Sequence, residues 1–241
     1  MKLDDIKKLQ QKKYRSELGY FLLEGEHLIL ELEKAAQLNP LLQAATVYVS
    51  DSYGDRVTGF MPVRISDKKM QQISSTKSPQ GIIAVVPMSA LQNAPHKDAK
   101  RTVYLYEIQD PGNLGTILRT LAWFGGFKCV LSRNSVDPYN PKVVRASMGA
   151  IFNVPLELDI CLSDLSARFD RFACLDLNGA PLSAPSFADH RCFIFGNEAR
   201  GVPHELLQHL SLESFSIPGS GVLESLNVAS AVNMCAYELN R

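Results

Sequence analysis

The chain has 241 residues and a mass of 26.7 kDa, and its 25 basic and 25 acidic residues give a formal net charge of zero. This balance excludes a uniformly basic nucleic-acid coat protein, and a content of 46% hydrophobic and 21% charged residues excludes a disordered chain. The length allows one or two domains, and we expect two. The charged start MKLDDIKKLQQKKYR does not resemble a secretion signal, and no apolar run approaches the ~18 residues of a membrane helix. We therefore expect a cytoplasmic protein that does not associate with membranes.

The cysteines and histidines give no indication of a metal site. The five cysteines form no CxxC pair and lie mostly in apolar runs, so we expect reduced, buried thiols rather than disulfides or a zinc site. The five histidines show neither HxxxH nor HExxH spacing, so we expect no catalytic metal.

The charge is unevenly distributed along the chain. Residues 1–96 carry 12 basic and 10 acidic side chains, residues 97–145 carry 8 and 4, and residues 146–241 carry 5 and 11. The first fifteen residues hold six cations against two carboxylates, which could contact phosphates. The alternative is a solvated amphipathic helix with Leu3, Ile6 and Leu9 on its buried side.

The first part of the chain shows α/β alternation. We expect a helix from residue 6 to 11, and a strand entering a helix over residues 21–38 that ends before Pro40. Further strands are expected at 45–50, 62–66 and 81–87. The stretch 88–101 is polar and lacks periodicity, so we place a linker at 93–101 between domains at 1–92 and 102–241.

The second part repeats the alternation and predicts a mostly parallel sheet with helices on both faces. The expected strands are 102–108, 128–132, 172–177, 192–196 and 214–218. The expected helices are 113–125, 140–148, 163–169, 203–209 and 225–240.

Three segments that follow predicted strands carry the polar residues of interest. The first, DPGNLGTILR at 110–119, takes a strand through a Pro-Gly turn into a helix. Asn113 therefore lies at a helix N-terminus, where its side chain can cap and backbone N–H groups face outward. Arg119 lies farther along the same helix. From these residues alone, a simple cap and a surface arginine are the alternatives.

The second segment, FGNEARGVP at 195–203, places Glu198 between Gly196 and Gly201 directly after a strand. Open α/β sheets bind ligands beyond the carboxyl ends of their strands, although a solvated Glu–Arg pair in an ordinary loop is an alternative. We expect Gly196 to allow close approach of a ligand and Gly201 to form a tight turn.

The third segment, IPGSGVLESLNVASA at 217–231, joins a strand to a helix through a Gly-rich loop. We expect Ser225 to cap this helix. Asn227 is an amide in an apolar turn and requires a hydrogen-bond partner. The small residues after it either let a partner subunit come close or belong to an ordinary core helix.

Together and in this order, NxGxxxR at 113–119, GNExxG at 196–201 and IPxxGxxxSLNVAxA at 217–231 resemble the SpoU (TrmH) family of RNA ribose 2′-O-methyltransferases, within the SPOUT superfamily. Residues 142–150 resemble the SxGA stretch between the first two motifs. Residues 15–27 and 74–86 resemble the substrate-binding domain of longer members. The chain departs from many relatives at Gly219 and Ser220, where a Met commonly follows the proline.

The resemblance implies a small N-terminal α/β substrate-binding domain and a C-terminal α/β domain whose last segment is threaded into a trefoil knot. It also implies a homodimer and S-adenosylmethionine as the cofactor. The cofactor-binding positions that it implies are Gly196, Asn197, Ile217, Ser225 and Leu226.

The catalytic set implied by the resemblance is centred on Arg119. Because an arginine guanidinium stays protonated in proteins, we prefer Arg119 as the cation that binds the target phosphate and stabilises the developing alkoxide over a role as general base. Asn113 would orient Arg119 or the ribose. Glu198 would anchor the guanidinium and Asn113, and Asn227 would complete the polar set.

DNA lacks the 2′-hydroxyl that accepts the methyl group, so the expected partner is RNA, with rRNA first and tRNA second. Two other classes are weighed: a noncatalytic RNA-binding protein that kept the fold, and a nucleotide-dependent enzyme of doubly wound fold, which lacks the GxGxxG and GxxxxGK[ST] motifs. The residues expected to bind RNA are Lys7, Lys8, Lys12, Lys13, Arg15 and Arg145.

Overall fold

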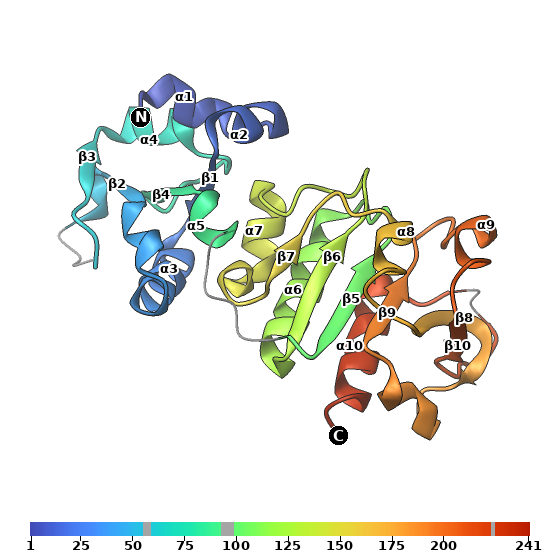
Figure 1. The fold of residues 1–241 in the computed structure, drawn as a ribbon. Coiled ribbons are helices and arrows are strands. Elements are labelled where there is room, and N and C mark those ends of the chain that lie inside the picture. The colour runs from blue at the N-terminus through green and yellow to red at the C-terminus, as the bar shows by residue number, and fades with distance from the viewer. Residues whose placement is uncertain (55–58, 93–98, 223–224) are drawn as a thin grey trace. The chain divides into compact units, whose positions relative to one another are not determined.

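The computed structural model describes residues 1–54, 59–92, 99–222 and 225–241. The chain divides into two compact units (Figure 1). Unit 1 is Met1–Pro95 with Asp137–Asn153, and unit 2 is His96–Val136 with Val154–Arg241. The chain therefore passes between the units three times. Residues 93–98 of the expected linker lie outside the described residues, and the domain limits 1–92 and 102–241 stay a prediction.

Unit 1 is built on a mixed four-stranded sheet in the order β1-β4-β2-β3. Strand β4 is antiparallel to both β1 and β2, and β3 runs parallel to β2. The strands confirm those expected from the sequence: β1 (Tyr20–Glu24), β2 (Thr46–Ser50), β3 (Val63–Ile65) and β4 (Ile82–Pro87). The helices of this unit are α1 (Leu3–Lys8), α2 (Lys12–Leu18), α3 (Glu26–Leu38), α4 (Asp67–Ile73), α5 (Ser89–Gln92) and α7 (Pro141–Ser147).

The helix expected over residues 6–11 is confirmed only in part, because α1 covers Leu3–Lys8 and a second short helix, α2, begins at Lys12. Gln11 is extended, with φ −102° and ψ 136°, and separates them. Next to it, the side-chain amide of Gln10 donates to the backbone oxygens of Ile73 and Ser74. Ile6 and Leu9 are fully buried, as the amphipathic pattern predicts. Tertiary hydrogen bonds and burial thus accompany the early end of α1, and the sequence pattern did not indicate α2.

Unit 2 contains a six-stranded sheet in the order β10-β8-β9-β5-β6-β7, and every neighbouring pair is parallel. This confirms the expected mostly parallel sheet. Its strands are β5 (Arg101–Leu105), β6 (Phe127–Leu131), β7 (Leu156–Glu157), β8 (Phe172–Pro181), β9 (Cys192–Phe195) and β10 (Leu212–Ser216). Its helices are α6 (Pro111–Phe124), α8 (Leu162–Leu165), α9 (His204–Leu207) and α10 (Val228–Glu238).

The helices of unit 2 cover the sheet and bury its apolar side chains. Tyr104, Val130 and Ile194 point to the same face of the sheet and pack with Leu162 and Leu165 of α8. Helix α6 packs against β6 and against α10. All five cysteines are free thiols.

Several element ends differ from the expected ones. The last helix begins at Val228, because Asn227 rather than Ser225 is its N-cap. The helices expected at 163–169 and 203–209 are single turns, α8 and α9. Strand β5 ends at Leu105, and Glu107 takes the left-handed conformation with φ 46°. A left-handed residue cannot continue the pleated ladder, so the loop that carries the first motif starts here.

None of the described helices is long and apolar enough to cross a membrane. Over the same described residues, no group of three or more His, Cys, Asp or Glu side chains is placed to hold a metal ion.

Candidate active site

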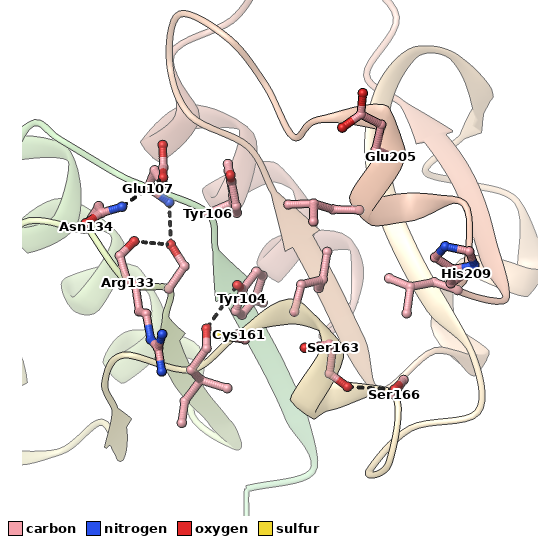
Figure 2. Close-up of a pocket in the computed structure, with 15 residues that line it drawn as sticks. Tyr104, Tyr106, Glu107, Arg133, Asn134, Cys161, Ser163, Ser166, Glu205 and His209 are labelled. Carbon is pink, nitrogen blue, oxygen red and sulfur yellow. Dashed lines mark hydrogen bonds between the residues drawn. The ribbon is translucent and has the colours of Figure 1, made fainter.

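Two cavities open in unit 2 near the carboxyl ends of its strands. One, of about 410 Å³, lies between the end of β5, α8 and α9 (Figure 2). The other, of about 430 Å³, is lined by three separate segments: the start of α6, the loop after β9 and the start of α10. The second cavity is called the motif cavity below. It brings together the sequence-predicted residues Asn113, Asn197, Glu198, Ser225, Leu226 and Asn227.

Three side chains of the motif cavity form a continuous hydrogen-bond chain. Nδ2 of Asn227 donates to Oδ1 of Asn113 at 2.9 Å, and Nδ2 of Asn113 donates to Oε1 of Glu198 at 3.1 Å. Oδ1 of Asn227 accepts from the backbone N–H groups of Ala229 and Ser230. Reversing the Asn227 amide would break these capping bonds, so the direction of the whole chain is fixed and ends on the carboxylate acceptor.

The start of α6 explains why Asn113 faces the cavity. Asp110 is the N-cap, and its Oδ1 accepts from the backbone N–H of Asn113 at 2.7 Å, while Pro111 occupies the first turn. The carboxylate of Glu198 lies 3.4 Å from the backbone nitrogens of Gln109 and Asp110. The positive end of the helix therefore favours a carboxylate at this position.

The loop that carries Glu198 closes on itself. The backbone groups of Asn197 and Gly201 bond to each other in both directions, at 3.1 and 2.9 Å, and Gly201 is left-handed with φ 64°. A Cβ on Gly196 would lie 2.5 Å from the carbonyl carbon of Gly201. The structure thus gives Gly196 a packing reason, closure of the loop, and the expected close approach of a ligand stays a prediction.

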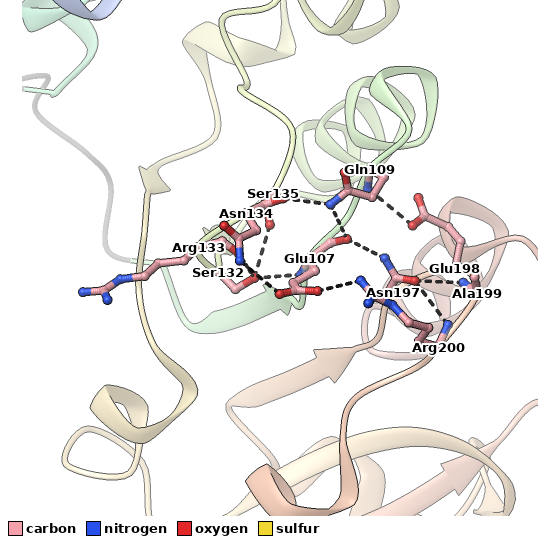
Figure 3. A network of polar contacts seen from close by, with 10 residues as sticks. All are labelled: Glu107, Gln109, Ser132, Arg133, Asn134, Ser135, Asn197, Glu198, Ala199 and Arg200. Atoms are coloured by element: carbon pink, nitrogen blue, oxygen red, sulfur yellow. Dashed lines mark hydrogen bonds and ion pairs between the residues drawn. The ribbon is translucent and has the colours of Figure 1, made fainter.

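Glu107, which no sequence motif indicated, links three loops (Figure 3). Its carboxylate is 3.0 Å from Nη2 of Arg200 and 3.2 Å from Nδ2 of Asn134, and its carbonyl oxygen accepts from Nδ2 of Asn197 at 2.7 Å. Its backbone nitrogen donates to Oγ of Ser132. No sequence motif surrounds Glu107. Only its left-handed backbone and these contacts show that it holds the loop that carries Glu198.

Arg119 and Ile217 do not line the motif cavity. Arg119 is exposed on α6, and within the described part of the chain its guanidinium makes no hydrogen bond or ion pair. Six residues along a helix correspond to roughly 240° of rotation and about 9 Å of rise, which points Arg119 away from Asn113. Among the residues that the structure describes, the expected contact between Glu198 and the guanidinium of Arg119 is absent.

Comparisons with known proteins match both parts of the chain. Residues 100–237 match the SpoU rRNA Methylase family, and residues 2–84 match the MRM3-like substrate binding domain. The chain belongs to the SpoU rRNA methylase family. Its fold class, an N-terminal domain before a SPOUT-type α/β domain, agrees with that membership.

Individual relatives of this SpoU protein cover nearly its whole length. It is 33% identical over 245 residues to the 23S rRNA (guanosine(2553)-2'-O)-methyltransferase RlmP of Bacillus subtilis, spanning 99% of this chain and 95% of the relative. It resembles the solved AdoMet-bound rRNA methyltransferase of Sinorhizobium meliloti at 25% identity and a TM-score of 0.78, over 98% and 93% of the two chains. The SpoU methyltransferase AviRb of Streptomyces viridochromogenes shares the fold at 21% identity and a TM-score of 0.79, over 99% and 96%.

The cations at the start of this SpoU protein lie in unit 1, and the lysines differ from Arg15. Four lysines are exposed: Lys7, Lys8, Lys12 and Lys13. Arg15, by contrast, is only 2% exposed. It donates to Oδ2 of Asp137 through Nε and Nη2, at 2.8 and 2.5 Å, and to the backbone oxygen of Leu9. The placement of Arg15 among the RNA-binding cations is therefore corrected, because this buried guanidinium is fully engaged within unit 1.

Arg145 also makes a contact inside unit 1. Its Nη1 donates to Oγ of Ser75 at 2.7 Å, and Ser75 in turn donates to the carboxylate of Glu24. Burial raises the pKa of Glu24, but hydrogen bonds from Ser74, Thr76 and Ser75 outweigh burial and hold this pKa below its ordinary value. Arg145 is half-buried, so part of its guanidinium stays accessible.

Proposed function

We propose that this protein transfers the methyl group of S-adenosylmethionine to the 2′-hydroxyl of a ribose in ribosomal RNA, with tRNA as the second choice of substrate. The observation that carries the proposal is the hydrogen-bond chain of Asn227, Asn113 and Glu198, built by three distant segments in a member of the SpoU family. The name of the Bacillus relative, which matches over nearly the full length, describes a 2'-O-methyltransferase of 23S rRNA.

The hydrogen-bond chain leaves capacity for a substrate hydroxyl. Asn113 has two amide protons and two acceptor lone pairs, of which Glu198 takes one proton and Asn227 takes one lone pair. One donor and one acceptor are left to hold a ribose. Because a ribose 2′-hydroxyl is a weak nucleophile at neutral pH, holding it in line with the methyl group supplies much of the rate.

Arg119 is proposed as the cation that binds the target phosphate and stabilises the developing alkoxide. It shares one exposed stripe of α6 with Trp123, four residues on, whose side chain is 85% exposed. Tyr237, on the neighbouring helix α10, is 57% exposed and packs edge-on against Phe124 of α6. Exposed aromatic side chains on these two neighbouring helices favour the proposed homodimer, which would place Arg119 against a second copy.

The loops at the ends of β8, β9 and β10 fit S-adenosylmethionine. These strands are neighbours in the sheet. Leu177 of β8, and Val222 and Leu226 after β10, are exposed by 70%, 82% and 48%. Such uncovered apolar side chains suit an adenosine moiety, which is largely apolar on its faces. Bound there, the cofactor supplies an electrophilic methyl group on a positively charged sulfur. Gly196, Asn197, Ile217, Ser225 and Leu226 are the proposed holding positions.

Unit 1 is proposed to provide RNA affinity through its exposed lysines and Arg145. A basic surface of this kind gives sequence-independent attraction to phosphates. The trefoil knot expected from the family is also part of the proposal, supported by the return of Asn227 to the start of α6. The cytoplasm is the proposed place of action.

The experiment that tests the function is transfer of labelled methyl from S-adenosylmethionine to rRNA transcribed in vitro, which carries no modifications. We expect incorporation at one ribose, mapped by resistance of its 3′ phosphodiester to alkali, because a methylated 2′-oxygen cannot attack the phosphate. A protein that binds rRNA but neither transfers methyl groups nor binds S-adenosylmethionine in calorimetric titration would be the noncatalytic RNA-binding alternative.

A further inference from the structure

The cavity of about 410 Å³ beside β5 takes no part in the reaction proposed above (Figure 2). Its volume falls within the ~300–1,000 Å³ typical of small-ligand sites. The walls are mainly apolar and aromatic: Tyr104 and Tyr106 come from β5 and its end, Ile160 precedes α8, and Leu206 and Leu210 come from α9 and the turn after it. The residues that form it all belong to unit 2, so it is a feature of one compact body.

Most polar groups in this cavity already have partners. The hydroxyl of Tyr104 donates to the backbone oxygen of Ile160 at 3.1 Å, and Oγ of Ser166 donates to the backbone oxygen of Ser163. The carboxylate of Glu107 is held by Arg200 and Asn134. These groups therefore hold the walls of the cavity in place through bonds within the protein.

Arg133 is different. Its side chain is exposed at the rim, and in the described residues its guanidinium makes no hydrogen bond or ion pair. Figure 3 shows it pointing away from the polar network around Glu107. An unpaired guanidinium beside an apolar aromatic cavity suits a ligand that has both a flat ring and an anionic group, because guanidinium binds phosphate through paired hydrogen bonds.

This cavity shares a wall with the motif cavity. Glu107 lines the first, whereas Asn197 and Gln109 line the second. The backbone oxygen of Glu107 accepts from Nδ2 of Asn197 at 2.7 Å and from Nε2 of Gln109 at 3.1 Å. Only one layer of hydrogen-bonded groups therefore separates the two cavities.

We propose that the cavity beside β5 binds a base of the RNA next to the ribose that is methylated, with Arg133 contacting the phosphate of that nucleotide. The inference rests on the proposed function, since it takes the motif cavity as the site of the ribose. Proteins that read unpaired RNA hold splayed-out bases on aromatic side chains. Tyr106 offers such a surface, and Glu205 and His209 at the other side of the cavity offer polar groups for the edges of a base.

Two substitutions test the site in the full-length protein: Tyr106→Ala removes the aromatic surface, and Arg133→Ala removes the cation. Each is expected to raise KM for unmodified rRNA transcript about tenfold, within the range found for loss of one stacked base, and to leave Kd for S-adenosylmethionine unchanged. The matched controls are Tyr106→Phe, which keeps the ring, and Arg191→Ala, which removes an exposed arginine just before β9, at the opposite end of the sheet. Unchanged KM in both Ala variants overturns the proposal, as does weakened binding of S-adenosylmethionine in either.

A second measurement does not depend on methyl transfer. Ribosomal RNA transcribed with 5-bromouridine is photo-crosslinked to the wild-type protein, and the attached peptides are identified by mass spectrometry. Crosslinks to Tyr106 or to residues 160–163 support the base site, and crosslinks confined to unit 1 overturn it. If the wild-type protein crosslinks at Tyr106 but transfers no methyl group, the proposed reaction fails while the base site stands.

Discussion

The side-chain nitrogen of Asn227 lies 2.9 Å from the side-chain oxygen of Asn113, although 114 residues separate them in the chain. Each of the two asparagines is also tied to the start of a helix. Asn227 caps α10, and the backbone nitrogen of Asn113 is held by the cap of α6. The contact therefore sets the relative position of two helix starts and aims Asn113 at Glu198.

Two substitutions of Asn227 distinguish its role as the N-cap of α10 from its proposed role in catalysis. Asn227→Asp keeps a capping oxygen but replaces the amide donor with an acceptor facing Oδ1 of Asn113, so we expect loss of methyl transfer with little change in stability. Asn227→Ala removes both functions and is expected to destabilise the protein by about 1 kcal/mol as well. Turnover and urea unfolding of both variants check this. Full activity of the Asp variant would show that the amide donor is dispensable.

Arg119 is expected to act on the reaction and not on cofactor affinity. Arg119→Ala should reduce single-turnover methyl transfer by at least ~100-fold, because a cation near developing charge is worth several kcal/mol in a water-poor site. Kd for S-adenosylmethionine, measured by calorimetry, should stay as in the wild type. Arg119→Lys tests the geometry, since a point charge replaces a planar fork. A wild-type rate of methyl transfer in the Ala variant would contradict the proposed role of Arg119.

The lysines of α1 and α2 are expected to contribute RNA affinity. Replacing Lys7, Lys8, Lys12 and Lys13 with Gln should weaken rRNA binding and flatten the dependence of log K on log salt by roughly 0.7–0.9 for each phosphate that is no longer neutralised. Filter binding over a salt series measures both. Lys34→Gln, at an exposed position of α3, serves as the control. An unchanged slope of log K against log salt in the quadruple variant would show that α1 and α2 are solvated amphipathic helices that do not bind RNA.

The ion pair of Arg15 and Asp137 is expected to be structural. Because Arg15 is 2% exposed, Asp137→Asn leaves a buried cation without its counter-charge, and Arg15→Met leaves the carboxylate unpaired. Each single change is expected to cost roughly 3–5 kcal/mol of the free energy of unfolding, and the double variant less than the sum of the two. Urea unfolding of the three variants measures the coupling. Additive effects would mean that the two side chains stabilise unit 1 independently.

The lowered pKa of Glu24 predicts that the stability of the protein depends on pH. Its pKa in the folded protein lies below the ordinary value of 4.5, so its hydrogen-bonded carboxylate adds stability above that pH. The contribution is lost as pH falls from about 4.5 through the lower folded-state pKa, since the unfolded chain binds the proton first. Urea unfolding between about pH 3 and pH 6 should show a shallower decline for Glu24→Gln than for the wild type. Parallel declines would assign the acid sensitivity to other carboxylates.

The order and type of most strands and helices could be predicted from the sequence, because apolar periodicity records which side of an element faces the core. The strand and helix over residues 21–38 and the parallel sheet of unit 2 are examples. Prediction failed where a tertiary contact competes with the local pattern. The bonds of Gln10 to Ile73 and Ser74 accompany the end of α1 at Lys8, before the expected limit, and Asn227 takes the cap that Ser225 was expected to hold.

By itself the sequence determined the fold class, the two-part organisation implied by its motifs, and the residue types of the site, since these depend on local patterns and short spacings. Only the tertiary structure decided which of those residues meet. It joined Asn113, Glu198 and Asn227, turned Arg119 to another face of α6, and buried Arg15 against Asp137. It also revealed the role of Glu107. The parallel sheet brings together loops that are far apart in the chain, and Glu107 links them at the ends of the strands.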